Sequence, residues 1–258
     1  MGFGDELLLT GIVKKAYKLH KKPVCLGLQG KNYLDDVLWG EIFKNNPKIA
    51  PKPYKGCVWV PDIKGNRPYI DYSHLKPDKV AYKRFDIEPG ELFFTKDELR
   101  HEQEDFIYIE PNAKNPQKDW GFAKWQEVVQ ALPYNFIQGK GQLLDGVEQV
   151  RTRSFRDACA LLSRARLFVG TDGGLHHAAA ALGIPAVVIW GGLVAPDILG
   201  YKQHTNLHSG AKSCGSLKPC EHCRQALAAI TVEQVVNAIN RVLSERPTQA
   251  NEQVAALL

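Results

Sequence analysis

The stretch LFVGTDGGLHHAAAALGIPAVVIW, residues 167–190, contains two continuous apolar runs separated by a glycine turn and an alanine-rich segment. The runs Leu167–Val169 and Ala186–Trp190 have no polar alternation, which is typical of central strands in a parallel sheet covered on both faces. Between them the sequence predicts a helix over residues 174–182, ended by the Gly-Ile-Pro sequence that follows. The stretch therefore predicts a strand–helix–strand unit at the centre of an α/β fold.

The turn at Gly173-Gly174 predicts an anion site. A helix that begins there, just past the carboxyl end of a strand, presents free backbone N–H groups and a positive dipole end to the sheet edge. The side chains around this turn are Thr171, Asp172, His176 and His177. The plainer interpretation is an ordinary turn in which Asp172 caps the helix and the histidines are packed. We favour the anion site, because packing alone does not require this combination of residues at a strand end.

The segment from Thr171 to Pro185 resembles the D-[ST]-G-x-x-H-x-A-A-x-x-x-x-P signature of the bacterial ADP-heptose:lipopolysaccharide heptosyltransferase family. In this register Asp172, Gly174 and His177 match the signature, whereas Gly173 replaces the usual Ser or Thr. The replacement removes one hydroxyl and leaves more of the phosphate contact to backbone N–H groups. The resemblance implies a compact glycosyltransferase of the GT-B type, with two Rossmann-like doubly wound α/β domains facing a cleft. Neither a dinucleotide fingerprint nor a P-loop is present, which argues against a dehydrogenase or kinase.

The chain has 258 residues, of which 44% are apolar and 24% charged, as in globular proteins. No apolar run reaches the ~20 residues needed to span a bilayer and no signal peptide opens the chain, so we expect a cytoplasmic protein without a transmembrane segment. Predicted strands alternate with helices, the pattern of a doubly wound parallel sheet. We expect an acceptor-binding α/β domain of reduced size over 1–103, a Rossmann-like nucleotide-sugar domain over 104–245 that includes a cysteine loop over 214–223, and a tail over 246–258.

The net charge of +5 lies entirely in the first part of the chain. Residues 1–100 carry 18 Lys and Arg against 13 Asp and Glu, whereas residues 101–258 carry 15 against 15. If the first part binds the acceptor, an acidic acceptor is expected, either a phosphorylated glycolipid or a nucleic acid. Between 61 and 89, tyrosines alternate with lysines in a pattern that could stack on and neutralise a polyanion. Solvated lysines and a loop with a few packed rings are the alternative interpretation.

Two catalytic residues are implied by the resemblance. The family's first segment ends in a Gly-Asp whose aspartate is the catalytic base, which corresponds here to Gly4-Asp5, although the strand that normally precedes it is missing. A family Lys-x-Trp that reaches the reaction centre corresponds to Lys118-Asp119-Trp120. A lysine there would offset the charge that develops on the departing nucleotide diphosphate. The alternatives are a helix N-cap for Asp5 and a surface lysine beside a core tryptophan for Lys118.

Three further residues are expected to contact the nucleotide sugar. Asn112 follows a strand predicted over 106–109, and Gln138 ends a strand predicted over 135–138, where by topology the ribose or base should lie. Pro196 closes a Gly-x-x-x-Pro segment that the family often has, and it could shape a loop over the phosphates.

The sequence Cys214-x5-Cys220-x2-Cys223 lies in a polar loop, whereas the other three cysteines fall in apolar elements. Three sulfurs at this spacing and one imidazole, from His208 or His222, could bind a structural zinc or iron ion. Several relatives that resemble this chain carry cysteines here, some as a metal-binding finger. Free thiols are the alternative.

Together these features predict an inverting glycosyltransferase that transfers a sugar from an ADP- or UDP-linked donor to a hydroxyl of an acidic acceptor. The acceptor candidates are lipopolysaccharide core and, in a phage-type enzyme, a hydroxymethylated DNA base. Catalysis should not need a metal ion, because no D-x-D pair is placed to bind the diphosphate and the helix dipole and Lys118 would supply the positive field. The alternative from another class is a non-catalytic nucleotide-binding or metal-clipped interaction module.

Overall fold

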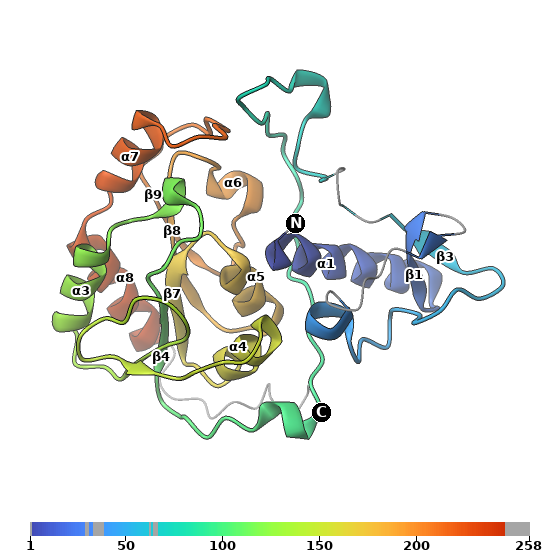
Figure 1. Cartoon of the computed structure of the whole chain (residues 1–258), viewed down its shortest axis with the longest axis horizontal. Helices are drawn as coiled ribbons and strands as arrows, with labels where there is room; N and C mark the ends of the chain where they lie inside the picture. Colours follow the sequence, from blue (N-terminus) through green and yellow to red (C-terminus); the bar gives the residue numbers. More distant parts are fainter. Residues whose placement is uncertain (1, 29–30, 33–38, 62, 64–66, 246–258) are drawn as a thin grey trace.

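The computed structural model describes residues 2–28, 31–32, 39–61, 63 and 67–245. Its largest element is a six-stranded sheet in the order β6-β5-β4-β7-β8-β9, in which every pairing is parallel (Figure 1). The strands are β4 (Ile107–Glu110), β5 (Phe136–Gln138), β6 (Glu148–Gln149), β7 (Leu167–Thr171), β8 (Ala186–Trp190) and β9 (Thr205–His208). The predicted α/β fold with a parallel sheet is confirmed.

Helices cover both faces of this sheet, and neighbouring residues of its central strands point to opposite faces. Tyr108 and Phe168 lie in one buried cluster with residues of α4 and α5, and Ile109 and Val169 lie in a second cluster with residues of α3 and α8. The helices of this region are α3 (Phe122–Gln130), α4 (Phe155–Leu162), α5 (Gly174–Ala181), α6 (Pro196–Leu199), α7 (Glu221–Ala228) and α8 (Val232–Glu245). Because both faces are covered, the central strands need no polar residues.

The strand order reverses between β4 and β7. The chain moves outward in one direction from β4 to β5 and β6, and in the other direction from β7 to β8 and β9. In doubly wound sheets the ligand crevice lies at this reversal, beyond the carboxyl ends of the strands. Here those ends are Glu110 on β4 and Thr171 on β7.

The first part of the chain contains a much smaller sheet. The sheet consists of β1 (Val24–Leu28), β2 (Lys31–Asn32) and β3 (Val58–Val60), and the same part of the chain contains α1 (Phe3–His20) and the π-helical turn η1 (Trp39–Phe43). Strand β1 pairs antiparallel with β2 and parallel with β3. Among the described residues before β4 there is no second doubly wound sheet, because the chain after β3 forms the 3-10 turns η2 (Tyr72–His74) and η3 (Lys96–Leu99) in place of further strands.

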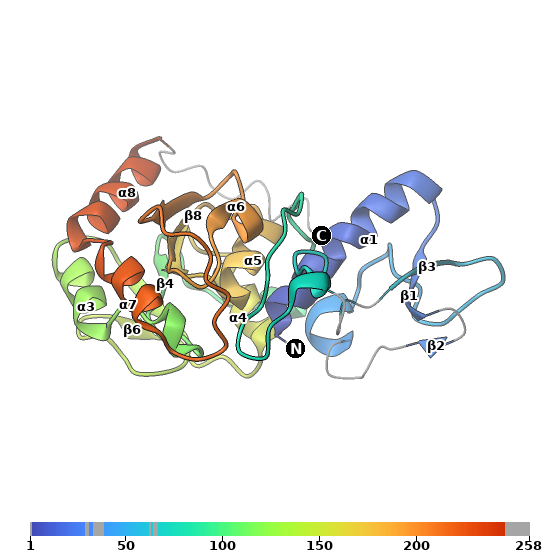
Figure 2. The same ribbon diagram turned by 90° about the horizontal axis from the view of Figure 1, so that it is seen from above.

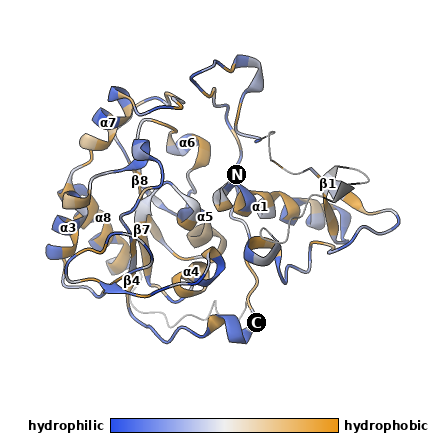
Figure 3. Ribbon diagram, viewed as in Figure 1, coloured by the Kyte–Doolittle hydropathy of each residue, from blue (hydrophilic) through white to orange (hydrophobic). Residues whose placement is uncertain are grey.

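Helix α1 joins the small sheet to the large one. Leu7 and Leu8 of α1 belong to the same buried cluster as Ala178 and Ala179 of α5, so one apolar core runs from one sheet to the other. Figure 2 shows α1 leading from α5 to β1 and β3, and Figure 3 shows apolar segments along its length. The boundaries near 103 and 245 remain predictions, and the tail over 246–258 lies outside the described residues.

Within the described ranges, no helix has the length and apolar character that crossing a membrane requires.

Candidate active site

The glycine turn follows the carboxyl end of β7, as predicted, and this end lies at the sheet reversal. Gly173 is the N-cap of α5 in an extended conformation and offers no side-chain cap, so the interpretation of Asp172 as the N-cap is wrong. The N–H of Gly173 donates to Nδ1 of His176 at 3.2 Å. A Cβ atom on Gly173 would have only the Thr171 carbonyl oxygen near it, at 3.8 Å. Gly173 therefore borders open space beside the positive end of the α5 dipole.

Lys118 and Asp172 meet beside this turn. Lys118 ends the 3-10 turn η4 (Pro116–Lys118), and its Nζ lies 2.6 Å from Oδ2 of Asp172, whose side chain is only 6% exposed. The other carboxylate oxygen, Oδ1, lies 3.8 Å from Nδ1 of His176. Three potential metal-ligand atoms, from Asp172, His176 and His177, lie within 4.8 Å of one another. However, the Asp172 carboxylate already forms an ion pair with the ammonium group of Lys118. A cation at this place would have to compete with the ammonium group of Lys118 for the Asp172 carboxylate.

Gly174 and Gly4 have a packing function. A Cβ atom on Gly174 would lie 3.0 Å from the Phe155 ring and 3.7 Å from the backbone nitrogen of Gly4. A Cβ atom on Gly4 would lie 2.7 Å from the ring of His177. These glycines let the N-terminal turns of α1 and α5 approach closely, so the positive ends of two helix dipoles meet at one place. Of the two turn glycines, only Gly173 faces a space that a ligand could enter.

This difference gives a paired test. Gly174→Val should lower the free energy of unfolding by about 1–3 kcal/mol, because its side chain would overpack Phe155 and Gly4. Gly173→Ala should fold with nearly unchanged stability and weaken nucleotide binding, since its methyl group enters the open side of the turn. Urea unfolding and nucleotide titration of both variants make the comparison. Wild-type stability for Gly174→Val would show that the contact with Phe155 is not tight.

The two histidines that follow the turn, His176 and His177, lie within α5, and both side chains are buried. His176 is fully buried, and Nδ1 of His177 lies 2.8 Å from the hydroxyl of Tyr201. His204 packs on Tyr201 and His176, and neither of its ring nitrogens has a hydrogen-bond partner among the described residues. Burial lowers the pKa of each of the three histidines to about 3, so all are neutral at pH 7. They therefore shape the floor of the site and carry no charge to it.

These lowered pKa values predict acid sensitivity. As the pH falls below about 6.5, the unfolded chain binds protons on His176, His177 and His204 while the folded chain does not. Their contribution to stability is therefore complete above pH 6.5 and is lost progressively toward pH 3. Burial raises the pKa of Glu110 to about 7, so between pH 4.5 and 7 the folded chain binds a proton at Glu110 that the unfolded chain does not. This proton raises the stability as the pH falls and so partly offsets the loss due to the histidines. Urea unfolding between pH 4 and 7.5 should show a shallower slope for His204→Phe, and an equal slope would contradict a buried neutral His204.

Asp5, the predicted base, lies in the first turn of α1 with its carboxylate fully engaged. Both Nε and Nη2 of Arg67 lie 3.0 Å from its Oδ2, and the hydroxyl of Tyr69 donates to its Oδ1. Tyr82 stacks on Tyr69 at 6.4 Å between ring centroids. Burial raises the pKa of Tyr82, and the nearby charge of Asp172 raises it further. Tyr69 therefore contacts Asp5, and Tyr82 packs on Tyr69.

Arg67 and Tyr69 were not among the predicted site residues. Tyr69 and Tyr82 belong to the segment in which tyrosines alternate with lysines, and that pattern was the available signal. Both rings are largely buried, whereas Tyr72 from the same segment is 40% exposed.

Asn112 and Gln138 do not project freely into the crevice. Both hold the loop after β5, since Asn112 accepts from the N–H of Gln142 at 3.1 Å and Gln138 donates to the Gln142 carbonyl at 2.6 Å. Pro196 is the first residue of α6. Glu110 was not predicted, although it ends β4 at the strand reversal and accepts from the N–H of Asn112 at 3.0 Å.

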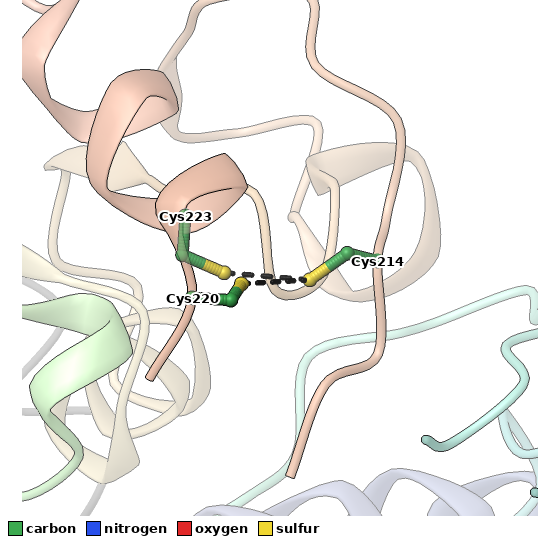
Figure 4. Close-up of side chains that lie close together, drawn as sticks. All are labelled: Cys214, Cys220 and Cys223. Carbon is green, nitrogen blue, oxygen red and sulfur yellow. Dashed lines mark hydrogen bonds between the residues drawn. The ribbon is translucent and has the colours of Figure 1, made fainter. Parts of the chain in front are cut away.

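The three cysteines of the loop come together (Figure 4). Sγ of Cys214 lies 3.8 Å from Sγ of Cys220 and 3.4 Å from Sγ of Cys223. Three sulfur donors at this separation fit three positions of a tetrahedral zinc or iron site. Neither predicted fourth ligand joins them: Nε2 of His222 lies 2.8 Å from the Lys212 carbonyl oxygen, and His208 lies outside the cluster.

A segment of the first part, residues 67–83, reaches across to this loop, and we call it the arm. The N–H of Val80 donates to the Gly215 carbonyl at 2.7 Å, and the N–H of Leu217 donates to the Asp78 carbonyl at 2.9 Å. Gly215 has φ +61°, and a Cβ atom on it would lie 1.8 Å from the Val80 carbonyl oxygen. The pairing therefore requires glycine at this position. Figure 1 shows the arm rising beside the chain before α7.

Comparison with known proteins supports the predicted resemblance. Residues 151–224 match the family model for glycosyltransferase family 9 (heptosyltransferase), a range that includes the glycine turn and the cysteine loop. No curated protein matches the chain.

Solved structures share the fold. The chain is 14% identical to the family 9 glycosyltransferase from Veillonella parvula, with a TM-score of 0.65 over 95% of both chains. It is 18% identical to TibC, an iron-containing dodecameric glycosyltransferase from enterotoxigenic E. coli, with a TM-score of 0.63 over 95% of this chain and 74% of TibC. TibC has also been solved with ADP-D-β-D-heptose.

The ADP-heptose lipopolysaccharide heptosyltransferase II of E. coli is 19% identical, with a TM-score of 0.48, and the match covers 60% of this chain and 54% of that enzyme. The chain thus spans about half the length of that relative. The resemblance predicted from the glycine turn is confirmed: residues 151–224 match the model of glycosyltransferase family 9, and the chain shares the fold of a solved family 9 structure.

Proposed function

We propose that the chain is an inverting glycosyltransferase that uses a nucleotide diphosphate sugar. The observation that carries the proposal is the pairing of Lys118 with Asp172 at 2.6 Å, next to the open side of Gly173 and the N-termini of α1 and α5. Two helix dipole ends supply a positive field where a diphosphate would lie, and Lys118, which Asp172 holds beside it, would add a cationic contact. The bound ADP-heptose of TibC, a protein of the same fold, supports a donor of this class.

In the proposed reaction, Asp5 accepts the proton of an acceptor hydroxyl. The oxygen then forms a bond to the anomeric carbon on the face opposite the diphosphate, and the bond from that carbon to the diphosphate oxygen breaks. Lys118 offsets the charge that develops on the departing nucleotide diphosphate. Arg67 and Tyr69 hold the Asp5 carboxylate in a fixed orientation. Gly4, Thr171 and the N-terminus of α5 line the same region, and the buried side chains of His176 and His177 pack behind it.

Asn112, Gln138 and Pro196 stay assigned to the donor side of the site in this proposal. Asn112 and Gln138 would act by fixing the loop after β5, which borders the sheet reversal where the nucleoside is expected. Whether the base is adenine or uracil is set by contacts that this loop makes, and the ADP-linked donor is favoured because TibC binds one.

We propose that the acceptor is acidic and binds against the arm. Lipopolysaccharide core and a hydroxymethylated DNA base are both kept as acceptor candidates. The basic excess of the first part suits either acceptor. A cytoplasmic location remains part of the proposal, as does the alternative of a nucleotide-binding module without catalysis.

A donor screen followed by a transfer assay tests the proposal. Thermal shift with ADP- and UDP-linked sugars should identify the donor, because a ligand at ~100 times its dissociation constant adds roughly 2.7 kcal/mol of stability. Transfer of labelled sugar is then measured on truncated lipopolysaccharide and on hydroxymethylated duplex DNA. A donor that binds without transfer to either acceptor or to water would favour the non-catalytic module. Stability unaffected by every nucleotide sugar would remove the proposal altogether.

The cysteine cluster should hold about one zinc or iron ion per chain. A bound ion would fix the loop around Cys214, Cys220 and Cys223 and would not itself contact the reacting groups. Elemental analysis of protein purified without a metal-affinity step should find the ion, and Cys220→Ser should lose both the ion and several degrees of thermal stability. Cys25→Ser is the matched control for a buried thiol outside the loop. Wild-type protein that is free of metal and equally stable after treatment with a chelator would assign the three residues as free thiols.

A further inference from the structure

Gln117 connects the cysteine loop to the turn that carries Lys118. It lies in η4 and is only 4% exposed. Its side-chain Nε2 donates to the Ser216 carbonyl at 2.8 Å and lies 3.8 Å from Sγ of Cys223. One amide group therefore reaches from η4 both to the loop and to the first turn of α7.

The turn itself has little freedom to move independently. The N–H of Gln117 donates to the side chain of Asn115 at 3.0 Å, which closes the start of the turn. On the other side, a Cβ atom on Gly191, the residue that follows β8, would lie 3.1 Å from the Gln117 carbonyl oxygen. The backbone of η4 is thus held between the end of β8 and the cysteine loop.

The residue after Gln117 is Lys118, whose Nζ meets Asp172 at 2.6 Å. A long lysine side chain has many rotamers, and its position over the donor site depends on where its backbone is fixed. Since the Gln117 side chain ties that backbone to Ser216 and Cys223, a displacement of the loop would displace Lys118. The same loop holds the arm through Gly215, so it contacts both sides of the site.

We propose that Gln117 is a positioning residue that makes the placement of Lys118 depend on the cysteine loop. The proposal rests on the proposed function in assigning Lys118 to the departing diphosphate. Its structural core is independent of that assignment: the loop and the Lys118–Asp172 ion pair are coupled through one buried side chain amide.

The first test observes Lys118 without any ligand. In protein labelled with 15N-lysine, the Nζ signal of Lys118 is assigned by its loss in Lys118→Arg. Gln117→Met keeps the length of the side chain and removes its donor, and Gln117→Glu replaces the amide by a carboxylate that cannot donate. Both should move the Lys118 signal toward those of exposed lysines. The signal of Lys48, which pairs with Glu91 at 2.6 Å outside this region, is the internal control and should stay.

Gln126→Met is the matched control variant. Gln126 also joins a helix to a loop, since its Nε2 donates to the Asp145 carbonyl at 3.0 Å, but it has no link to the cysteine loop. Gln126→Met should leave the Lys118 signal unchanged, although it should lower the stability by about as much as Gln117→Met does. A Lys118 signal that is unchanged in Gln117→Met and Gln117→Glu would overturn the proposal.

The second test measures release of ADP from ADP-heptose. Gln117→Met should lower kcat about 10- to 100-fold, because small misplacement of a charge-stabilising group is felt mainly in the transition state. The KM for the donor should change much less than kcat, and Gln126→Met should leave both near wild type. A 10- to 100-fold rise of KM with an unchanged kcat would contradict the positioning role. If the wild type does not release ADP, the proposed function fails for this donor, while the Lys118 signal still decides whether Gln117 couples the loop to the ion pair.

Discussion

Lys118→Met is expected to lower both the stability and the rate of sugar transfer. Asp172 is 6% exposed, and without Lys118 its carboxylate would be buried beside the neutral His176, with no cation to pair with among the described residues. Removing one partner of a buried ion pair typically costs about 3–5 kcal/mol, and we expect the lower end because Lys118 is 24% exposed. Turnover should fall at least ~100-fold, since the departing diphosphate loses its cationic partner in the transition state.

The double variant Lys118→Met with Asp172→Asn separates the two effects. An amide needs no counter-ion, so stability should recover to within about 1 kcal/mol of wild type while transfer stays low. Lys44→Met is the control for an ion pair of similar length at a more exposed place, where Lys44 is 46% exposed and Glu98 20%, and it should cost less than 1 kcal/mol. Urea unfolding and donor turnover are measured on all four proteins. Full activity in Lys118→Met would show that the diphosphate does not use this lysine.

The central sheet and the glycine turn could be predicted because their signals are local. Runs without polar residues, as in Ala186–Trp190, identify strands covered on both faces, and glycine and proline identify the ends of the helix between them. Likewise, Lys118 and Asp172 were both predicted for the site, and the structure brings them to 2.6 Å. The family motifs identified these residues without giving their contact.

The remaining features depend on contacts between distant residues, which spacing does not show. Gly173 and Gly174 are adjacent and look equivalent in the sequence, yet one borders open space and the other packs on Phe155. That distinction arises because Phe155 of α4 and Gly4 of α1 both pack against the first turn of α5. The partners of Asp5, Arg67 and Tyr69, come from more than 60 positions away, in a segment with almost no regular structure.

Asp5→Asn is expected to have the largest effect on rate of any single replacement. Asparagine keeps the shape of the side chain and can still accept the hydrogen bond from Tyr69, but it cannot take up the proton of an acceptor hydroxyl. Loss of a positioned general base typically costs about 10²–10⁴ in rate. Affinity for the donor should stay within about threefold of wild type, because the carboxylate does not contact the proposed diphosphate site.

Arg67→Met tests whether the effect belongs to the carboxylate itself. Arg67 is 35% exposed and binds only one side of Asp5, so its loss should leave a carboxylate that Tyr69 still orients. Transfer by Arg67→Met should therefore fall much less than transfer by Asp5→Asn when both are measured on the same donor and acceptor. If instead the two variants lose the same activity, the ion pair acts as a structural unit between the arm and α1. In that case the base must be another group at the site, for which Glu110, with a pKa raised to about 7 by burial at the end of β4, would be the next residue to replace.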